Sequence, residues 1–569
     1  MRKFWIGIVV LAGMSSLLAG AEERGHGRSM VVTPYGIVAT SYVQASQAGA
    51  RVLERGGSAI DAGIAANAVL SVAEPMTNGM GGDLFAIYWE AKTGKLYGLN
   101  ASGWAPKGLT IEHLKAKGVT QTRTTGMPQV GIDSVTVPGA VDGWTKLHDR
   151  FGKRPWSELF EPAIFYAEHG YGVPEVVQSY WADASDKLRP YAESRRLFLP
   201  GDKTPAVGQV FRNPEMAKAL ALIAKDGEAA FYKGPIAQAI LKTSAAQGGT
   251  MTAEDLSSYS AEWVEPVSTK YRDWTVYELP PNGDGIAALQ MLNIMGQSQP
   301  SPDGPLSVAE LHERIEAMKL AYADVKAYDG DPRFGKIPVT ELLSQEFAAK
   351  RAKLVDPEKA NCDVAPGALG GSDTTYLSVV DRDGNVLSLI QSVYSSFGSA
   401  VTVEGEGFVL QNRGGLFSLD EKSPNALAGR KRPFHTIIPA FMERGTQHIG
   451  FGIMGGMNQP LAHAQFVSNF VDYGMNIQAA LEEARFTVSA KLGCNIVIES
   501  RVKPEVREKL TGMGHMFDVR KEYSTTMGRG QVVMFDSATG MKFGASDPRA
   551  DGVAEPEMPG VSGVGSGSQ

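Results

Sequence analysis

Thr374 stands at a point in the sequence where its hydroxyl group could do chemistry. It precedes an apolar run that reaches Asp383-Gly384, and a second apolar run follows and ends near Ser392. This pattern is typical of a β-hairpin. A three-residue loop, 382–384, with a positive φ at its glycine, places Thr374 opposite Ser392, whereas a two-residue loop places it opposite Val393. The first register sets two hydroxyl groups side by side, and an activated hydroxyl is a nucleophile.

A second candidate site is the glycine pair Gly455-Gly456. It follows a predicted strand, 448–453, and precedes Asn458 and Pro460, which are typical of helix starts. Backbone N–H groups at a helix start can bind an anion, and glycine leaves them open to approach. A plain tight turn would give the same pattern. The glycine-rich turn 78–83 precedes a predicted buried strand and could likewise bring backbone close to a ligand.

Several elements are predicted around these residues. A helix at 45–55 ends in glycines, and Ser58 caps an alanine-rich helix at 59–72, whose small side chains allow close packing. Further helices are predicted at 156–168, 214–224, 235–247 and 307–328, and strands at 30–32, 36–39 and 84–89. The charged residues expected to form the solvated face of helix 307–328 are Glu310, Glu313, Arg314 and Lys319.

Composition limits the class of protein. The 569 residues are 43% hydrophobic and 21% charged, with a formal net charge of -7, which is typical of a globular protein with a large core. No basic cluster suggests nucleic acid. The sequence matches no phosphate-loop, dinucleotide, zinc or calcium motif. Cys362 and Cys494 are the only cysteines, so no disulfide framework is expected, and the sequence does not decide whether they pair.

The first 21 residues have the features of a secretory signal peptide. A basic start, Met1-Arg2-Lys3, precedes an apolar stretch, 4–18, and the small residues Ala19-Gly20-Ala21. The apolar stretch is short for a membrane span. We therefore expect a signal peptide at 1–21 and export to the periplasm or the medium, with a retained membrane anchor as the alternative. The Gly/Ser-rich end, 560–569, is expected to be a flexible tail.

Together these motifs resemble the γ-glutamyltransferase family of N-terminal-nucleophile hydrolases. The resemblance rests on Asp373-Thr374-Thr375 with its hairpin, on Ser392 in the returning strand, and on Gly455-Gly456 before a helix. It extends to the segments 79–82, 135–139, 280–285 and 544–549, and so covers nearly the whole chain after residue 21. The resemblance implies an α+β fold, the four-layer αββα N-terminal-nucleophile hydrolase sandwich.

The resemblance also implies a proenzyme that cuts its own chain between Asp373 and Thr374. Residues 22–373 would become a large subunit and residues 374–569 a small subunit of one intertwined domain. The freed Thr374 would offer its Oγ1 as nucleophile and its α-amino group, with a pKa of about 8, as base. Ser392, where the family has threonine, would orient Thr374. The N–H groups of Gly455 and Gly456 would hold the oxyanion.

The expected substrate pocket departs from that of the transpeptidases. They hold the glutamyl α-carboxylate with an arginine, where this chain offers Tyr88. Their aspartate for the α-amino group would fall near Leu416, and Arg413 stands where glutamine or glutamate is usual. Further replacements in the pocket are His435-Thr436 for a pair of serines, Tyr376 for a histidine and Tyr394 for an asparagine. A glutamyl group would therefore lose charge-assisted contacts worth about 1.5 to 3 kcal/mol each.

The segment 432–439 looks more like that of cephalosporin acylases and oxamate amidohydrolases. We hypothesise that Arg413 and His435 hold a carboxylate on a different acyl group; the alternative is that Arg413 is structural.

The resemblance predicts a self-processing amidohydrolase that cleaves an amide of the γ-glutamyl or glutathione type through an acyl-enzyme on Thr374, by hydrolysis or acyl transfer. The alternatives are an acylase for a non-glutamyl amide and an inert exported scaffold of the same fold. No metal, organic cofactor, nucleic acid or membrane is expected as a partner. The expected partners are a small-molecule amide and the two subunits themselves.

Overall fold

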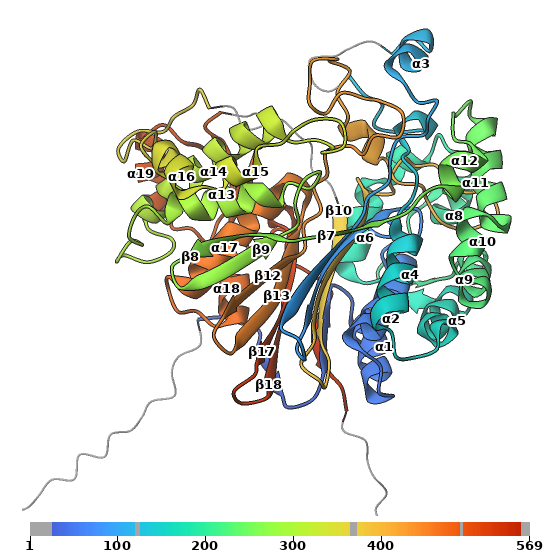
Figure 1. The fold of residues 1–569 in the computed structure, drawn as a ribbon, viewed down its shortest axis with the longest axis horizontal. Helices are drawn as coiled ribbons and strands as arrows, with labels where there is room; N and C mark the ends of the chain where they lie inside the picture. Colours follow the sequence, from blue (N-terminus) through green and yellow to red (C-terminus); the bar gives the residue numbers. More distant parts are fainter. Residues whose placement is uncertain (1–24, 120–125, 365–372, 490–492, 559–569) are drawn as a thin grey trace, which may run out of the picture.

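Two seven-stranded antiparallel sheets stack face to face and carry helices on their outer faces (Figure 1). The computed structural model describes residues 25–119, 126–364, 373–489 and 493–558. The predicted signal peptide, 1–21, and the predicted tail, 560–569, lie outside these ranges. The four-layer αββα arrangement that the sequence predicted is confirmed.

The sheet that carries Thr374, which we call the β10 sheet, has the strand order β19-β2-β10-β11-β3-β4-β7. Its strands are β2 (Ile37–Thr40), β3 (Asp83–Glu90), β4 (Lys95–Ala101), β7 (Glu262–Val264), β10 (Asp373–Val380), β11 (Val386–Tyr394) and β19 (Val553–Pro556). The second sheet, which we call the β13 sheet, has the order β1-β18-β17-β13-β12-β9-β8. Its strands are β1 (Val31–Thr33), β8 (Val267–Tyr271), β9 (Trp274–Glu278), β12 (Ala440–Arg444), β13 (Gln447–Met454), β17 (Arg529–Asp536) and β18 (Met541–Ser546).

The helices fall into two layers, one on each sheet (Figure 1). The layer on the β10 sheet includes α1 (Val43–Glu54), α2 (Ala59–Ala73), α4 (Ala140–Phe151), α5 (Glu161–His169), α9 (Pro214–Asp226) and α11 (Pro235–Ala246). The layer on the β13 sheet includes α13 (Gly285–Met295), α14 (Val308–Tyr328), α17 (Gln459–Val471) and α18 (Ile477–Glu482). A three-stranded sheet, β14 (Phe486–Val488), β15 (Asn495–Glu499) and β16 (Met516–Arg520), joins the second layer with α19 (Pro504–Gly512).

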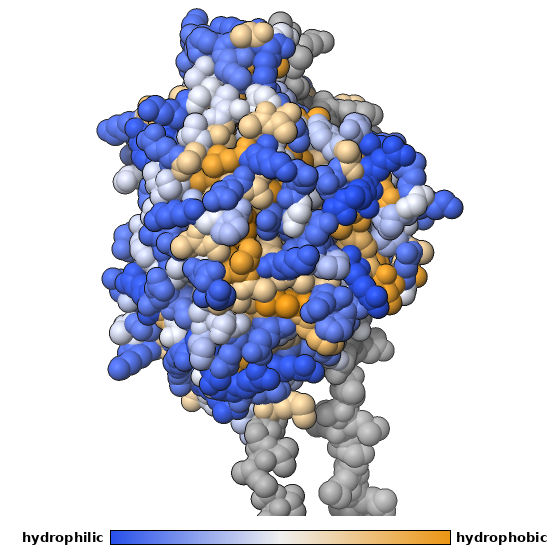
Figure 2. Space-filling model, turned by 90° about the vertical axis from the view of Figure 1, so that its right-hand side faces the viewer, coloured by the Kyte–Doolittle hydropathy of each residue, from blue (hydrophilic) through white to orange (hydrophobic). Residues whose placement is uncertain are grey.

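The remaining helices are short and lie around these layers. They are α3 (Ile111–Ala116), α6 (Glu175–Asp183), α7 (Ser185–Leu188), α8 (Ala192–Phe198), α10 (Glu228–Tyr232), α12 (Ala253–Ser257), α15 (Val339–Leu342) and α16 (Gln345–Ala352). Figure 2 shows one face of the molecule, where hydrophilic side chains cover most of the surface and apolar ones are scattered. Within the described residues, every helix is too short or too polar to cross a membrane.

The hairpin of β10 and β11 has the register that the three-residue loop predicts. Val380 pairs with Val386, and Thr375 pairs with Gln391. Gly384 has a φ of 86°, which is readily available to glycine. Beyond Thr375 the register shifts by one residue, since Asp373 pairs with Tyr394, and Thr374 lies at this irregularity beside Ser392. The two-residue loop is therefore wrong.

The alanine-rich helix α2 packs directly on this hairpin. Ser58 and Asp61 form the capping box that begins the helix, with the Asp61 N–H donating to Ser58 Oγ at 3.2 Å. A Cβ added at Gly63 would lie 2.3 Å from a methyl carbon of Leu387 on β11. Small side chains on α2 therefore let the helix lie close to the strands that carry the nucleophile candidate.

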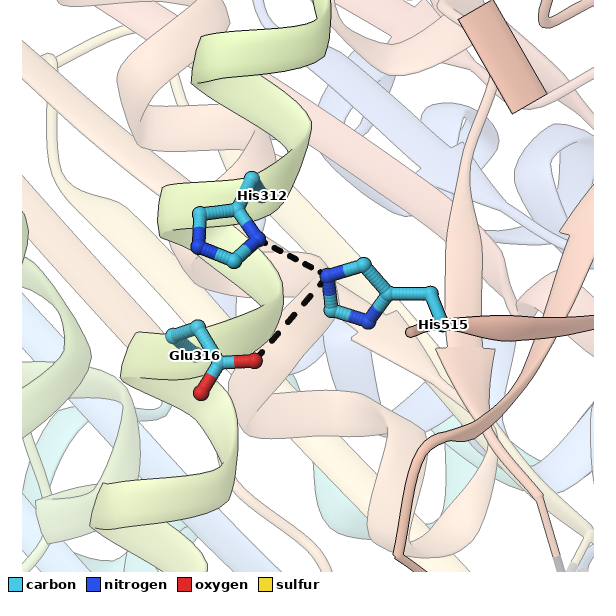
Figure 3. Close-up of side chains that lie close together, drawn as sticks. All are labelled: His312, Glu316 and His515. Carbon is cyan, nitrogen blue, oxygen red and sulfur yellow. Dashed lines mark hydrogen bonds and ion pairs between the residues drawn. The ribbon is translucent and has the colours of Figure 1, made fainter. Parts of the chain in front are cut away.

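The prediction that helix 307–328 has a solvated face made of Glu310, Arg314 and Lys319 is wrong. All three side chains are buried, between 0% and 4% exposed, and only Glu313 is partly exposed. Arg314 donates to Glu310 at 2.8 Å, and Lys319 donates to Glu316 at 2.7 Å. Elements from distant parts of the sequence cover α14, so its charges pair with one another instead of with water. Figure 3 shows part of this buried face, where His312 and Glu316 of α14 meet His515.

Candidate active site

Thr374 lies near the start of β10, on the face between the two sheets. Its side chain is fully buried, and its hydroxyl donates a hydrogen bond to Ser392 Oγ at 3.2 Å. The next residue, Thr375, points to the other face and donates to Glu74 Oε2 at 2.9 Å. Because side chains alternate along a strand, this pair shows which threonine belongs to the space between the sheets. The sequence-based pairing of Thr374 with Ser392 is present in the structure.

Two contacts fix how β10 and β11 lie over β13. Tyr376 packs on Gly452, where an added Cβ would lie 2.4 Å from the ring. Ser388 lies on β11, two residues nearer the turn of the hairpin than Ile390, the partner of Tyr376. It faces Gly450, where an added Cβ would lie 3.7 Å from the Cβ of Ser388. Moving away from the turn along the hairpin therefore means moving toward the end of β13.

Thr374 thus lies at the level of Met454, the last residue of β13. Thr374 is two residues beyond Tyr376 along β10, and Met454 is two residues beyond Gly452 along β13, so each lies on the same face as its neighbour. Gly455 and Gly456 follow Met454 directly and have φ values of 143° and 61°. The predicted nucleophile and the predicted oxyanion glycines therefore come from opposing strands that meet at one end of the sandwich.

The glycine pair leads into α17 through a single turn, 456–458. The N–H of Asn458 donates to the carbonyl of Gly455 at 3.2 Å, and the Tyr322 hydroxyl donates to the carbonyl of Met457. Among the hydrogen bonds of the described residues, none has the N–H of Gly455 or Gly456 as its donor. The turn is thus anchored by its carbonyls, and both N–H groups are available. Their role as an oxyanion site stays a prediction.

Ser392 Oγ is the meeting point of three donors. Besides the Thr374 hydroxyl, it accepts from Arg413 Nη2 at 3.0 Å and from the Tyr394 N–H at 2.7 Å. An oxygen that receives a hydrogen bond from a cation is a poor base. These contacts suit Ser392 to positioning the hydroxyl of Thr374 better than to taking its proton, and its orienting role stays a prediction.

Arg413 places a buried positive charge beside this pair. Its Nη1 donates to Thr436 Oγ1 at 2.8 Å, and its guanidinium lies over the Tyr394 ring, 4.5 Å from the ring centre. Burial lowers the pKa of Arg413 to about 10, and the charges of Asp83 and Asp284 oppose that shift. Arg413 is therefore a cation at neutral pH.

His435 is held by Asp83, a residue that the sequence reasoning did not assign to the site. His435 Nε2 lies 3.0 Å from Asp83 Oδ2, and Asp83 Oδ1 accepts from the Gly103 N–H and from Gln411 Nε2, both at 2.8 Å. Burial lowers the pKa of His435 well below its ordinary value, with Arg413 adding to the shift, and burial raises the pKa of Asp83 to about 7. His435 is therefore neutral and donates to Asp83.

These contacts change the expected role of His435. The hypothesis that it holds a substrate carboxylate together with Arg413 requires an imidazole N–H that is free to donate. The ring instead lies tilted against Phe85, with ring centres 4.8 Å apart, and its Nε2 is engaged by Asp83. The Nε2 of His435 is thus already engaged, and among the pocket residues expected from the sequence Arg413 is the one that carries a positive charge.

Tyr88 lies outside this group. It pairs with Leu387 on β11, whereas Asp83 pairs with Ser392, so Tyr88 is at the opposite end of β3 from the nucleophile candidate. Its ring lies 4.4 Å from that of Phe151 on α4. Alternation and distance along β3 separate Tyr88 from the site, and we leave it out of the candidate pocket.

Asp284 is a further buried acid near Arg413 that sequence reasoning missed. It precedes α13, and both oxygens of its carboxyl group are buried without a hydrogen-bond partner among the described residues. Burial raises the pKa of Asp284 well above its ordinary value, and the charge of Arg413 lowers it in part. The only early signal was its place in the segment 280–285, which contributes to the family resemblance.

The arrangement can support nucleophilic acyl transfer. It combines a threonine hydroxyl, an orienting serine, two glycine N–H groups and a buried cation. In the part of the chain that the structure describes, one group could hold a metal ion, namely His312, Glu316 and His515 on α14 and the three-stranded sheet. That cluster is separate from the residues of the site, and the expectation that the reaction needs no metal stays a prediction.

Comparison with known proteins gives close matches over almost the whole chain. Residues 45–557 match the family described as Gamma-glutamyltranspeptidase. The glutathione hydrolase-like YwrD proenzyme of Bacillus subtilis is 36% identical over 534 residues, which are 93% of this chain and 99% of the relative. The oxamate amidohydrolase proenzyme of Klebsiella pneumoniae is 31% identical over 92% of this chain and 98% of its own. The crystal structure of cephalosporin acylase from Bacillus halodurans matches with a TM-score of 0.87 and 40% identity, over 95% of this chain and 99% of that one.

Proposed function

The chain belongs to the gamma-glutamyltranspeptidase family, and from that premise we propose that it uses Thr374 to cleave an amide whose acyl group carries a carboxylate. The enzyme class follows from the family, whose members here include proenzymes named as hydrolases and acylases. The observation that carries the finer proposal is the buried cation of Arg413, one hydrogen bond away from Ser392 and two from Thr374. A buried cation beside a nucleophile favours an anionic acyl group.

Maturation would begin with attack of Thr374 Oγ1 on the carbonyl carbon of Asp373. The peptide C–N bond breaks, an ester bond to Oγ1 forms, and the hydroxyl proton ends on the new amino group. Water then hydrolyses the ester, which releases the Asp373 carboxylate and a free Thr374. This order explains why the threonine is already hydrogen-bonded to Ser392 in the uncut chain.

Turnover would use the α-amino group of Thr374 as base. This group takes the proton of Oγ1, the oxygen attacks the amide carbonyl, and the oxyanion accepts from the N–H groups of Gly455 and Gly456. The amine leaves with the proton, and water or an acceptor amine then attacks the acyl-enzyme. Ser392 would hold Oγ1 in line throughout, because its other contacts fix its position.

The acyl group would be recognised by Arg413. Of the pocket residues expected from the sequence, Tyr88 lies far from the site and His435 is neutral, so Arg413 is the one whose charge could hold a substrate carboxylate. Its partner Thr436 adds a hydroxyl next to it. The preferred substrates would then be amides of a dicarboxylic acid, of the glutaryl type.

A second candidate is a γ-glutamyl amide, which one observation favours. The Asp284 carboxyl group is buried and unpaired near Arg413, within the residues that the structure describes. An ammonium group beside it would stabilise its ionised form. Arg413 and Asp284 would then hold the α-carboxylate and the α-amino group of the same glutamyl residue.

A set of three anilides with the same leaving group tests these proposals. We expect glutaryl p-nitroanilide to exceed butyryl p-nitroanilide in kcat/KM by about 10-fold to 150-fold, which corresponds to one charge-assisted contact of about 1.5 to 3 kcal/mol. Arg413→Met should remove this preference, and Arg413→Lys should keep part of it. If γ-glutamyl p-nitroanilide is the best substrate and Asp284→Asn lowers its turnover alone, the second candidate holds.

Three outcomes would overturn the proposal. Equal turnover of all three anilides, or an equal loss on all three in Arg413→Met, would make Arg413 structural. A purified wild-type chain that stays whole on a denaturing gel would favour the inert scaffold, and Thr374→Ala provides the uncut reference. Export remains part of the proposal and is supported by the signal-like residues 1–21.

A further inference from the structure

A disulfide bond joins residues on opposite sides of the proposed cleavage bond. Cys362 and Cys494 are bonded, with their Cα atoms 4.9 Å apart. Cys362 precedes Thr374 in the sequence and Cys494 follows it, so cleavage before Thr374 leaves one cysteine in each subunit. We propose that this bridge links the large and small subunits covalently in the mature enzyme. The inference rests on the proposed function in one respect, the cut before Thr374.

Backbone hydrogen bonds hold both cysteines in place beside the bridge. The N–H of Ala360 donates to the carbonyl of Met513, and the N–H of Met516 donates to the carbonyl of Cys494, both at 2.8 Å. The first of these bonds also crosses from the large subunit to the small one. The bridge therefore joins two segments that are already aligned by their backbones.

A buried polar cluster crosses the same boundary between the subunits (Figure 3). His312 and Glu316 lie on α14 of the large subunit, and His515 lies just before β16 of the small subunit. His312 Nδ1 and His515 Nε2 are 2.8 Å apart, and His312 Nε2 lies 2.7 Å from the carbonyl oxygen of Asp356. Since that carbonyl can only accept, His312 Nε2 carries a proton and donates to it.

Lys319 connects this cluster to the bridge itself. Its Nζ donates to Glu316 Oε1 at 2.7 Å and to the carbonyl of Asn361 at 3.0 Å, and it lies 3.6 Å from Cys494 Sγ. Lys319 and Cys494 are buried, whereas Cys362 is exposed. A reducing thiol can therefore approach the bridge from the Cys362 side, and Cys494 is sheltered by the cluster.

Formation of the bridge is a two-electron oxidation. The two thiols lose two protons and two electrons to an oxidising protein or small-molecule disulfide, which leaves as two thiols. Compartments outside the cytosol supply such oxidants, which agrees with the predicted export of the chain. Once the peptide bond is cut, the bridge keeps the subunits at an effective concentration on the order of millimolar, so dilution does not separate them.

Gel electrophoresis of the exported, matured enzyme tests the proposal directly. The enzyme is collected in N-ethylmaleimide, which blocks free thiols, and run with and without dithiothreitol. We expect one band of full mature mass without reductant and two bands with it. Cys362→Ser and Cys494→Ser should each give two bands in both lanes. Two bands from the wild type without reductant, with N-ethylmaleimide on both cysteines, would overturn the proposal.

The same gel separates failure of the bridge from failure of the cut. If the wild type gives one band even with dithiothreitol, the cut itself is absent and the proposed maturation fails. The disulfide bond can then still be detected in Thr374→Ala, by mass spectrometry of the linked peptides that contain residues 362 and 494. Absence of the linked peptide there would refute the bridge independently.

Dilution gives a functional measure of the same link. Cys362→Ser should have the initial turnover of the wild type, because Cys362 is not part of the active site. After unfolding in urea and dilution to nanomolar concentration, the variant should recover less activity than the wild type, because its subunits must find each other again. Equal losses in both proteins would show that the bridge does not hold the subunits together.

Discussion

Replacing Ser392 with alanine removes the oxygen on which the donors around Thr374 converge. The Arg413 guanidinium would lose one of its two side-chain acceptors, and the Thr374 hydroxyl would lose its acceptor. A hydrogen bond to a charged group contributes about 1.5 to 3 kcal/mol, which corresponds to about 10-fold to 150-fold in rate. Because Ser392 orients the nucleophile, we expect this loss in the rate of self-cleavage and in kcat, with little change in KM.

The assay follows the uncut chain over time after synthesis and then the turnover of the matured enzyme. Ser392→Thr is the matched control, because it keeps the oxygen and has the residue usual in the family. It should restore most of the rate that Ser392→Ala loses. A wild-type cleavage rate in Ser392→Ala would refute the reasoning, and so would a threonine variant as slow as the alanine variant. Equal melting temperatures of the variants would show that the effect is not a loss of folding.

Three further changes test other parts of the structure. Asp83→Asn should remove a pH dependence of stability, because the folded-state pKa of Asp83 is about 7 while the unfolded value is about 4. The contribution of Asp83 to the unfolding free energy is complete below pH 4 and is lost as the pH rises through 7, by up to about 1.4 kcal/mol per pH unit. Urea titrations at pH 5 and pH 7 in the uncut background check this prediction, and an unchanged pH slope contradicts it. Gly455→Ala should lower kcat about 100-fold or more, because its φ of 143° suits glycine and a shift of its N–H would disturb the oxyanion site. Gly540→Ala is the control, since Gly540 has a φ of 73° and open space around it, and this variant should leave kcat unchanged. Lys319→Met should cost about 3 to 5 kcal/mol in unfolding free energy, since it leaves Glu316 buried without its cation, and adding Glu316→Gln should recover part of the loss.

The hairpin could be predicted from sequence because its signals are local. A glycine that adopts a positive φ sets the loop length, and strand alternation then sets every pair up to Thr375 and Gln391, next to Thr374 and Ser392. The glycine pair before α17 is equally local. Together with the other matching segments, these two motifs carried the family resemblance, and the chemistry followed from that resemblance.

The residues around the nucleophile could not be predicted in the same way. Asp83 and His435 are 352 positions apart, and their contact depends on the stacking of the two sheets. Tyr88 lies outside the pocket for a related reason, since the pairing of β3 with β11 places it opposite Leu387 and away from Ser392. The charged residues of α14 were predicted to face solvent, because the elements that bury them lie much later in the sequence and give no local signal.

The buried charges also determine how the site should respond to pH. When Asp83 is ionised it offsets the charge of Arg413, and when Asp83 is protonated that charge is left for the acyl group. Because the pKa of Asp83 is about 7, binding of an anionic acyl group should strengthen as the pH falls from 8 to 6. The free α-amino group of Thr374, with an ordinary pKa of about 8, loses its basic form over the same range. KM and kcat should therefore both fall toward low pH, and Asp83→Asn should abolish only the change in KM.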